Sequence, residues 1–212
     1  ARVTKKAIIR PYRPTDRADV YDVCVRTAEG GGDSRHIYSD LDLMPSIFAG
    51  PYVHFEPDLA FVVDNGDRVV GYILGTADTA AFVDAYRKSW LPKLADRFPL
   101  VDPPVTRSDK MVVLMHDPER MLVPELVDYP AHLHIDLLPE YQRQGYGRGL
   151  IREFLDALRA KGVAAVHLGM VTTNVSARIF YDRVGFQEIP VADPGIHTYL
   201  VRGTDTPSHW RS

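Results

Sequence analysis

A glycine-rich turn between a strand-like run and an amphipathic segment constrains this chain most. Residues 142–147 read Gln-Arg-Gln-Gly-Tyr-Gly and follow the strand-like run 133–138. A helix is predicted from about Gly147 to Lys161, because apolar side chains recur there at helical spacing. Glycines let a backbone turn tightly and approach a ligand, and a helix N-terminus offers unpaired N–H groups. Such a strand–turn–helix unit predicts a phosphate or pyrophosphate site.

The remaining hydrophobic pattern predicts an α/β (α+β) protein. Two apolar runs, 59–63 and 69–75, flank an Asn-Gly pair and predict a β-hairpin. From residue 133 onward, strand-like and helical segments alternate, which favours a mixed sheet with helices on its faces. We therefore expect a single domain over residues 1–212, with an insertion at about 78–130.

Composition and charge exclude several function classes. The formal net charge is −3, so no basic field points to nucleic acid. The single cysteine, Cys24, excludes an intramolecular disulfide and a multi-cysteine zinc site. No apolar run approaches the roughly 20 residues of a membrane span, and no apolar signal-peptide core follows the N-terminal residues. We expect a cytoplasmic monomer or homodimer that binds neither nucleic acid nor membrane.

Two common nucleotide-binding motifs do not fit the turn. A P-loop requires Gly-x-x-x-x-Gly-Lys-Ser/Thr, which the chain lacks. A Rossmann fingerprint requires Gly-x-Gly-x-x-Gly early in the fold, whereas Leu150 stands where the third glycine belongs and the turn comes late in the chain. The turn therefore fits neither a P-loop nucleotide nor a Rossmann dinucleotide as its phosphate-bearing ligand.

Two sequence blocks resemble the GCN5-related N-acetyltransferase (GNAT) family. Residues 137–147 are similar to its acetyl-CoA pyrophosphate motif, which contains Gln-x-x-Gly-x-Gly. Residues 174–186 are similar to a second block, Asn-x-x-Ala-x-x-Phe-Tyr-x-x-x-Gly-Phe. The resemblance implies the GNAT fold, a mixed, mostly antiparallel sheet of about seven strands with helices on both faces. It also implies that strands 4 and 5 of this sheet splay apart.

A narrower resemblance concerns other parts of the chain. Residues 9–12, 71–78 and 89–92 are similar to the acetyltransferase-like C-terminal domain of animal O-GlcNAc hydrolases, as is the insertion at about 78–130. Those domains lack the Gln-x-x-Gly-x-Gly turn that this chain keeps. The chain thus resembles a bacterial-type relative that still binds the cofactor.

The GNAT resemblance implies acetyl-CoA as co-substrate. Backbone groups of Leu137 and Leu138 would pair with the pantetheine arm, and an N–H group there would polarise the thioester carbonyl. N–H groups from Arg143 to Arg148 would bind the pyrophosphate, aided by the charges of these two arginines. Asn174 would hydrogen-bond the pantetheine arm. The predicted cofactor-binding residues are Leu137, Leu138, Gln142, Arg143, Gln144, Gly145, Tyr146, Gly147, Arg148, Asn174 and Tyr181.

The predicted catalytic residues are Tyr181, Asp136 and His134. Tyr181 occupies the family's general-acid position, and a tyrosine with a pKa of about 10 is protonated at neutral pH. His132, His134 and Asp136 alternate along one strand and share a face. We expect Asp136 to be the general base, with His134 as the second candidate. Alternate residues of a strand are ~7 Å apart, so His132 and Asp136, the first and third of these residues, are too far apart to share an ion. No other group of metal-ligating residues is apparent, so we expect no metal.

These features predict direct acetyl transfer from acetyl-CoA to an amine on a small molecule or a protein. Cys24 is in the wrong place for an acetyl-enzyme. The acceptor site is predicted to come from the loop 30–36 and the insertion at about 78–130. A non-catalytic acetyl-CoA-binding sensor or interaction domain is the alternative, and O-acetyl transfer is a third option. The predicted acceptor-binding residues are Asp33, Asp78, Tyr86 and Trp90.

Overall fold

The structure is a computed structural model that describes residues 5–211. Residues 1–4 and 212, the ends of the domain expected over residues 1–212, lie outside the described part. The strands are β1 Ile8–Pro11, β2 Phe61–Asp64, β3 Val69–Thr76, β4 Ala131–Leu137, β5 Ala165–Val171, β6 Gln187–Glu188 and β7 His197–Gly203. The α-helices are α1 Arg17–Thr27, α2 Leu43–Phe48, α3 Gly50–Phe55, α4 Thr79–Ala85, α5 Arg107–Met115, α6 Tyr146–Ala160 and α7 Val175–Arg183.

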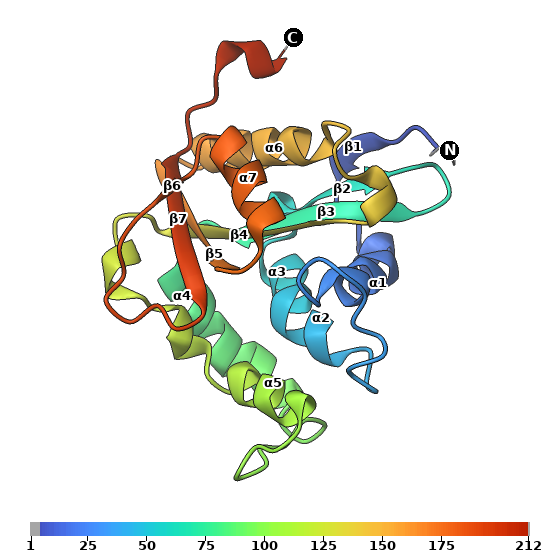
Figure 1. Cartoon of the computed structure of the whole chain (residues 1–212), viewed down its shortest axis with the longest axis vertical. Helices are drawn as coiled ribbons and strands as arrows, with labels where there is room; N and C mark the ends of the chain where they lie inside the picture. The colour runs from blue at the N-terminus through green and yellow to red at the C-terminus, as the bar shows by residue number, and fades with distance from the viewer. Residues whose placement is uncertain (1–4, 212) are drawn as a thin grey trace.

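The strands form one mixed sheet in the order β1-β2-β3-β4-β5-β7-β6. All neighbouring strands are antiparallel except β4 and β5, which are parallel. The β4–β5 ladder contains only the pairs Ala131–Val166 and His132–His167, after which the two strands diverge. In Figure 1, β7 accordingly runs at a large angle to β3 and β4. The predicted mixed, mostly antiparallel sheet that splays between strands 4 and 5 is confirmed.

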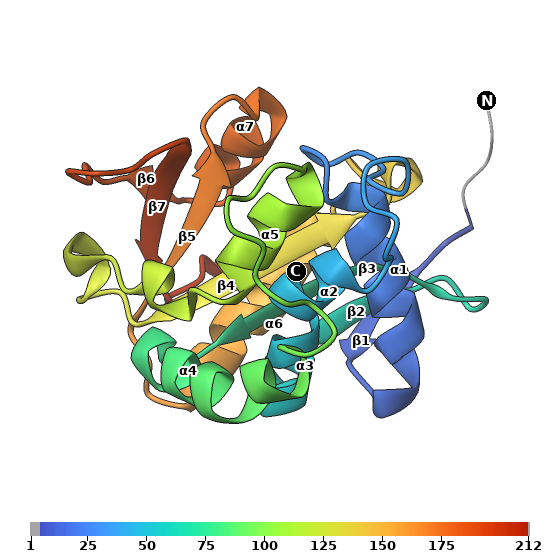
Figure 2. The ribbon, with the colours of Figure 1, turned by 90° about the horizontal axis from the view of Figure 1, so that it is seen from below.

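Helices cover both faces of the sheet. Figures 1 and 2 show α6 on one face, and α1, α2 and α3 on the other. The apolar stripe predicted for α6 is fully buried against β2, β3 and β4, which explains why this helix forms here. Its buried residues are Leu150, Ile151, Phe154, Leu155 and Leu158.

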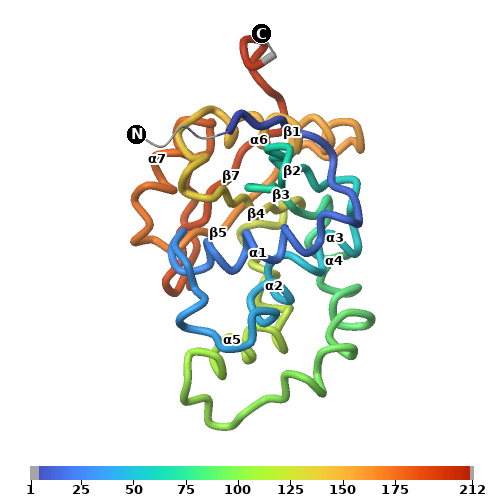
Figure 3. The backbone as a smooth tube through the Cα atoms, turned by 90° about the vertical axis from the view of Figure 1, so that its right-hand side faces the viewer, coloured from blue at the N-terminus to red at the C-terminus, as the bar shows by residue number. Residues whose placement is uncertain are grey.

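The segment between β3 and β4 is helical. It contains α4 and α5, and α5 begins with a capping box in which Thr106 and Asp109 bond each other's backbone N–H groups. Helix α5 packs on α2, and Figure 3 shows this segment at the end of the molecule opposite β1 and the C-terminal residues. Within residues 5–211, no helix combines the length and apolar character needed to cross a membrane.

Candidate active site

The backbone of β4 changes partners where the sheet splays. The N–H of Leu138 donates to the carbonyl of Val70 at 2.9 Å. Because backbone groups alternate in direction along an antiparallel ladder, the N–H groups of Ile135 and Leu137 point away from β3, toward the splay. Leu137 therefore fits the predicted contact with the thioester arm. The Leu138 N–H is not available for such a contact, because it already donates to β3.

The glycine turn forms an open cradle at the N-terminus of α6. Gly145 is the N-cap residue, with φ of 89° in the left-handed region, and no side chain caps this end of the helix. A Cβ at Gly145 would have no atom within 4 Å, so the space beside the N-cap residue is open. The positive end of the helix dipole faces this space. The cradle therefore fits a pyrophosphate.

Two glutamine side chains brace the turn. Gln142 donates its Nε2–H to the carbonyl of Leu137 at 2.9 Å, and Gln144 donates to the carbonyl of Glu140 at 2.6 Å. Both side chains are exposed. These hydrogen bonds within the chain hold the turn in shape, so both amide groups are already engaged there.

The other side chains of the turn point in different directions. The Tyr146 hydroxyl accepts a hydrogen bond from the Ala7 N–H at 3.0 Å. The Arg148 guanidinium lies 5.5 Å from the ring centre of Trp210. Arg143 is exposed and has φ of 60°, a conformation that a non-glycine residue rarely adopts. Arg143 is thus the better placed of the two arginines to contact a phosphate, and the Arg148 side chain lies on Trp210 instead.

Helix α7 packs directly on the glycine turn. A Cβ at Gly147 would lie 2.9 Å from the ring of Phe180, so only glycine allows this approach. Asn174 caps α7, accepting from the N–H of Ala177 at 3.1 Å, so its side-chain oxygen is engaged and its amide NH₂ is the group left for the predicted pantetheine contact.

Tyr181 follows Phe180 on α7 and reaches toward β4. Its ring contacts those of Phe180 and Phe186 at 5.3 and 5.7 Å between centres. Its hydroxyl has no hydrogen-bond partner among residues 5–211. Burial and the negative charge of Asp136 raise the pKa of Tyr181, so the phenol stays protonated at neutral pH. At neutral pH the Tyr181 hydroxyl therefore carries a proton, and its role as general acid stays a prediction.

Asp136 is a partly buried carboxylate on β4. Burial raises its pKa to about 7, while a hydrogen bond from the Tyr72 hydroxyl at 2.9 Å opposes this rise. Tyr72 stands directly opposite Asp136 in the β3–β4 ladder and is fully buried. A carboxylate with a pKa near 7 is half deprotonated at neutral pH and strong enough to accept a proton from an amine.

His134 precedes Asp136 by two residues on β4, so both side chains lie on the same face of the strand. Its Nε2 is 3.1 Å from the hydroxyl of Tyr52, which also hydrogen-bonds Nε2 of His132 at 2.6 Å. Burial, and then the charge of Arg120, lower the pKa of His134 to about 4. His134 is therefore neutral at physiological pH and a weaker base than Asp136.

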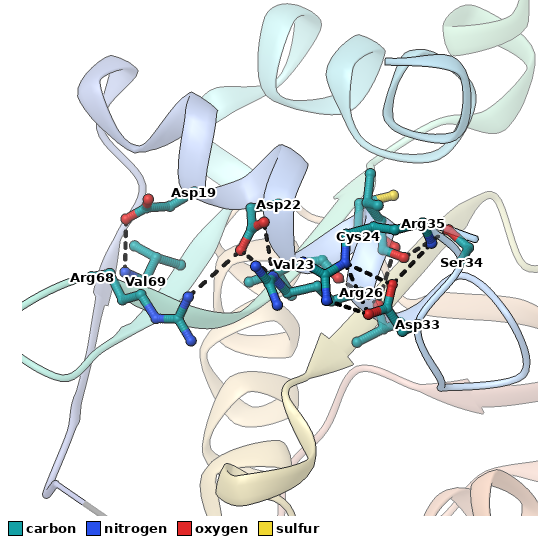
Figure 4. A network of polar contacts seen from close by, with 12 residues as sticks. Asp19, Asp22, Val23, Cys24, Arg26, Asp33, Ser34, Arg35, Arg68 and Val69 are labelled. Carbon is teal, nitrogen blue, oxygen red and sulfur yellow. Dashed lines mark hydrogen bonds and ion pairs between the residues drawn. The ribbon is translucent and has the colours of Figure 1, made fainter. Parts of the chain in front are cut away.

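The acidic residues predicted for the acceptor site are engaged within the chain. Asp33 binds the Arg35 guanidinium through both carboxylate oxygens, as Figure 4 shows. Asp78 is exposed at the N-cap of α4, where it accepts from the N–H of Ala81 at 3.2 Å. Asp33 remains accessible from solvent, whereas the cap explains why Asp78 occurs at its position.

The aromatic residues predicted for the acceptor site belong to the core. Tyr86 is 1% exposed and donates its hydroxyl proton to the Met115 carbonyl at 2.8 Å. Trp90 is 7% exposed and donates its indole N–H to the Ser46 carbonyl at 2.8 Å. Side chains whose rings and polar groups are both satisfied internally cannot hold an acceptor. The expectation of a cation–π site on Tyr86 and Trp90 is wrong.

Two other predictions concern a cysteine nucleophile and a metal ion. Cys24 is buried, and burial raises the pKa of its thiol well above the usual range, so a thiolate does not form there. In the described part of the chain, no three His, Cys, Asp or Glu side chains come together as a metal-binding group.

Tyr72 and Tyr52 are the site residues that sequence analysis missed. Each contacts a predicted catalytic residue, but from a segment 64 or 82 positions away. Tyr72 lies in a run that could be identified as a strand, yet its register against β4 depends on how the intervening insertion folds. No local signal in the sequence identifies these partners.

A family model and several known proteins match the chain. The model "Acetyltransferase (GNAT) domain" matches residues 112–188, which include β4, the glycine turn and α7. The crystal structure of SsHAT matches with 57% identity and a TM-score of 0.91, covering 94% of this chain and 99% of that one.

Two curated proteins match over shorter shares of their length. The rat protein O-GlcNAcase is 26% identical over 190 residues, which are 88% of this chain and 20% of that protein. The Escherichia coli K12 ribosomal protein bS18-alanine N-acetyltransferase is 35% identical over 66 residues, 31% of this chain and 45% of that one. The chain thus spans a fifth to under half of the length of these relatives. Together, the motifs, the splayed sheet and these similarities show that the chain belongs to the GCN5-related N-acetyltransferase family.

Proposed function

We propose that this protein is an acetyl-CoA-dependent N-acetyltransferase that transfers the acetyl group directly to an amine. The proposal rests on Asp136 of β4 and Tyr181 of α7, two titratable side chains close enough for the charge of Asp136 to raise the pKa of Tyr181. Asp136, with a pKa of about 7, is suited to accept a proton, and the raised pKa of Tyr181 keeps its phenol protonated and able to donate one. The open cradle at Gly145 supports acetyl-CoA as the donor.

Each step of the transfer has a residue to assist it. The amine nitrogen attacks the thioester carbon while Asp136 takes one proton from that nitrogen. The Leu137 N–H stabilises the negative charge that develops on the carbonyl oxygen. The carbon–sulfur bond then breaks, the bonding pair leaves on sulfur, and Tyr181 protonates the departing thiolate. The products are an amide and free CoA.

The direct test is amine-dependent release of CoA. The purified chain is incubated with acetyl-CoA and a panel of acceptors: diamines, amino sugars, peptides with free N-termini and lysine peptides. Free thiol is measured against a blank without acceptor, and mass spectrometry identifies the acetylated product. If the chain binds acetyl-CoA in calorimetry but no acceptor raises CoA release above the blank, the non-catalytic sensor or interaction domain becomes the better explanation.

Replacing Tyr181 by Phe is expected to lower kcat about tenfold. The loss is modest because a thiolate is a much better leaving group than an amine and needs less help from an acid. The phenylalanine ring keeps the contacts with Phe180 and Phe186, so the dissociation constant for acetyl-CoA should not change. Steady-state kinetics and calorimetry on the same preparation check this. An unchanged kcat would remove Tyr181 from the mechanism.

Replacing Arg143 by Asn is expected to raise stability while weakening acetyl-CoA binding. A left-handed conformation costs a typical residue about 1–2 kcal/mol, whereas Asn tolerates it, so the free energy of unfolding should rise by up to about 1 kcal/mol. Loss of the charge should raise the dissociation constant by about threefold to tenfold. Arg148→Asn is the control, because that guanidinium lies on Trp210. Equal weakening by both variants would contradict the assignment.

A further inference from the structure

A continuous chain of hydrogen bonds leads from the insertion to His134. The Thr79 hydroxyl lies 2.8 Å from the Pro130 carbonyl and 2.7 Å from Nδ1 of His132. Nε2 of His132 is 2.6 Å from the Tyr52 hydroxyl, which in turn is 3.1 Å from Nε2 of His134. Thr79, Tyr52 and His132 are all buried, so no solvent competes along this path.

The Pro130 carbonyl fixes the direction of every proton in this chain. A carbonyl only accepts, so the Thr79 hydroxyl donates to Pro130 and must accept from Nδ1–H of His132. Nε2 of His132 then carries a lone pair.

The same logic continues beyond His132. Because Nε2 of His132 accepts, the Tyr52 hydroxyl donates to it. The Tyr52 oxygen must therefore accept from Nε2–H of His134. His134 is left with an unprotonated Nδ1.

Both imidazoles are neutral, as this assignment requires. Burial is the main cause that lowers the pKa of His132 and of His134, and the charge of Arg120 lowers both further. A neutral imidazole has one N–H and one lone pair, so the tautomer of each ring follows from its partners.

Nδ1 of His134 has no hydrogen-bond partner within the described residues. Every fully buried side-chain nitrogen or oxygen in the described part of the chain has a hydrogen-bond partner. This nitrogen is therefore not fully buried. His134 and Asp136 share a face of β4, and their Cα atoms are about 6.6 Å apart at strand spacing. A nitrogen atom between the two side chains can contact both.

We propose that Thr79, His132 and Tyr52 are positioning residues that hold His134 in the Nε2–H tautomer, so that its Nδ1 accepts an N–H from the acceptor amine bound beside Asp136. This inference rests on the proposed function. A neutral primary amine has two N–H groups and one lone pair. One N–H then bonds His134, the other faces Asp136, and the lone pair points at the thioester carbon.

The chain orients His134 but does not conduct protons to solvent. Its far end is the Pro130 carbonyl, which accepts from both the N–H and the hydroxyl of Thr79 and cannot pass a proton on. Asp136 therefore remains the group that takes the proton, and His134 holds the acceptor nitrogen in place.

The test compares Thr79→Val with Thr79→Ser. Valine has nearly the shape of threonine but lacks the hydroxyl, so Nδ1–H of His132 loses its acceptor, which favours reversal of the whole chain. Serine keeps the hydroxyl. Nitrogen-15 NMR of histidine-labelled protein reports the tautomer of His134, assigned with a His134→Gln variant. We expect Nε2–H in the wild type and in Thr79→Ser, and partial or complete conversion to Nδ1–H in Thr79→Val.

Kinetics give the second readout. Thr79→Val should raise the KM for the acceptor about tenfold, with an unchanged dissociation constant for acetyl-CoA, and Thr79→Ser should behave like the wild type. A wild-type His134 in the Nδ1–H form, or a Thr79→Val variant with an unchanged tautomer, overturns the proposal. So does a converted tautomer with an unchanged acceptor KM. If no amine is acetylated at all, the proposed function fails, and the NMR result still decides whether the chain sets the tautomer.

Discussion

Replacing Asp136 by Asn is expected to lower kcat/KM at least ~100-fold and, at the same time, to stabilise the protein above pH 7. General base catalysis contributes about 10²–10⁴-fold, and an amide cannot accept the proton. Asn is nearly isosteric, and its oxygen can still accept the hydrogen bond from Tyr72. Burial disfavours the charged form of Asp136, so removal of the charge removes a cost that the folded state bears.

The sign of the stability change follows from the raised pKa. Folding increases proton binding at Asp136 between about pH 4, where an unfolded aspartate titrates, and about pH 7. The contribution of this group to stability is therefore fully present below the unfolded pKa and is lost as pH rises through the folded one. One pKa unit corresponds to about 1.4 kcal/mol, and with partial exposure taken into account we expect Asp136→Asn to be about 2 kcal/mol more stable at pH 8.

Chemical denaturation at pH 8 and pH 5 measures this difference, which should shrink at the lower pH. In parallel, the kcat/KM of the wild type should rise through about pH 7, a step that the variant lacks, while titration of the acceptor amine is common to both. Asp64→Asn is the matched control. The Gly66 N–H and the Arg10 side chain lower the pKa of Asp64, so its loss should destabilise the fold and leave the pH profile unchanged. An active Asp136→Asn variant would shift the role of base to His134.

The local elements of the site could be predicted from the sequence. The glycine turn and the buried stripe of α6 each depend on residues close together in the chain, so spacing alone identifies them. The same is true of the shared face of His134 and Asp136, because alternation along a strand is a local property.

The partners of these residues could not be predicted, because they depend on register. Backbone N–H groups of β4 point alternately toward β3 and toward the splay, so a register shift of one residue would exchange them. In this register the N–H of Leu138 is engaged by β3, whereas the N–H of Leu137 is free for a ligand. Trp90 shows a second limit. An aromatic stripe has the same pattern in a core as in a cation-binding site, and only the bond to the Ser46 carbonyl distinguishes the two.

Replacing Gly145 by Asp is expected to weaken acetyl-CoA binding about 100-fold, whereas Gly145→Asn should weaken it less than about tenfold. The backbone at Gly145 has φ of 89°, which Asn and Asp adopt more readily than other non-glycine residues. A Cβ meets no atom there. The two variants therefore bear a similar conformational cost and have nearly the same shape. They differ by one negative charge in front of the helix N-terminus.

That charge separates binding from folding, because the two effects have opposite signs. A carboxylate at a helix N-terminus stabilises the helix by about 0.3–1 kcal/mol, so Gly145→Asp should be at least as stable as Gly145→Asn. Toward a pyrophosphate in the cradle the same carboxylate is repulsive. The repulsion between two negative charges a few ångströms apart near a protein surface is about a few kcal/mol. This corresponds to about a 100-fold increase in the dissociation constant for acetyl-CoA.

Calorimetric titration of both variants with acetyl-CoA measures the difference in dissociation constant. The choice of Gly145 rather than Gly147 keeps this result easy to interpret. A side chain at Gly147 would meet Phe180 and displace the helix that carries Tyr181, so a loss of binding there would have two explanations. Gly145 has no such neighbour. S-acetyl-pantetheine, which lacks the pyrophosphate, should react equally well with the Asp and Asn variants. Equal acetyl-CoA affinity in the two variants would place the pyrophosphate elsewhere, and the turn would then be a structural link between β4 and α6.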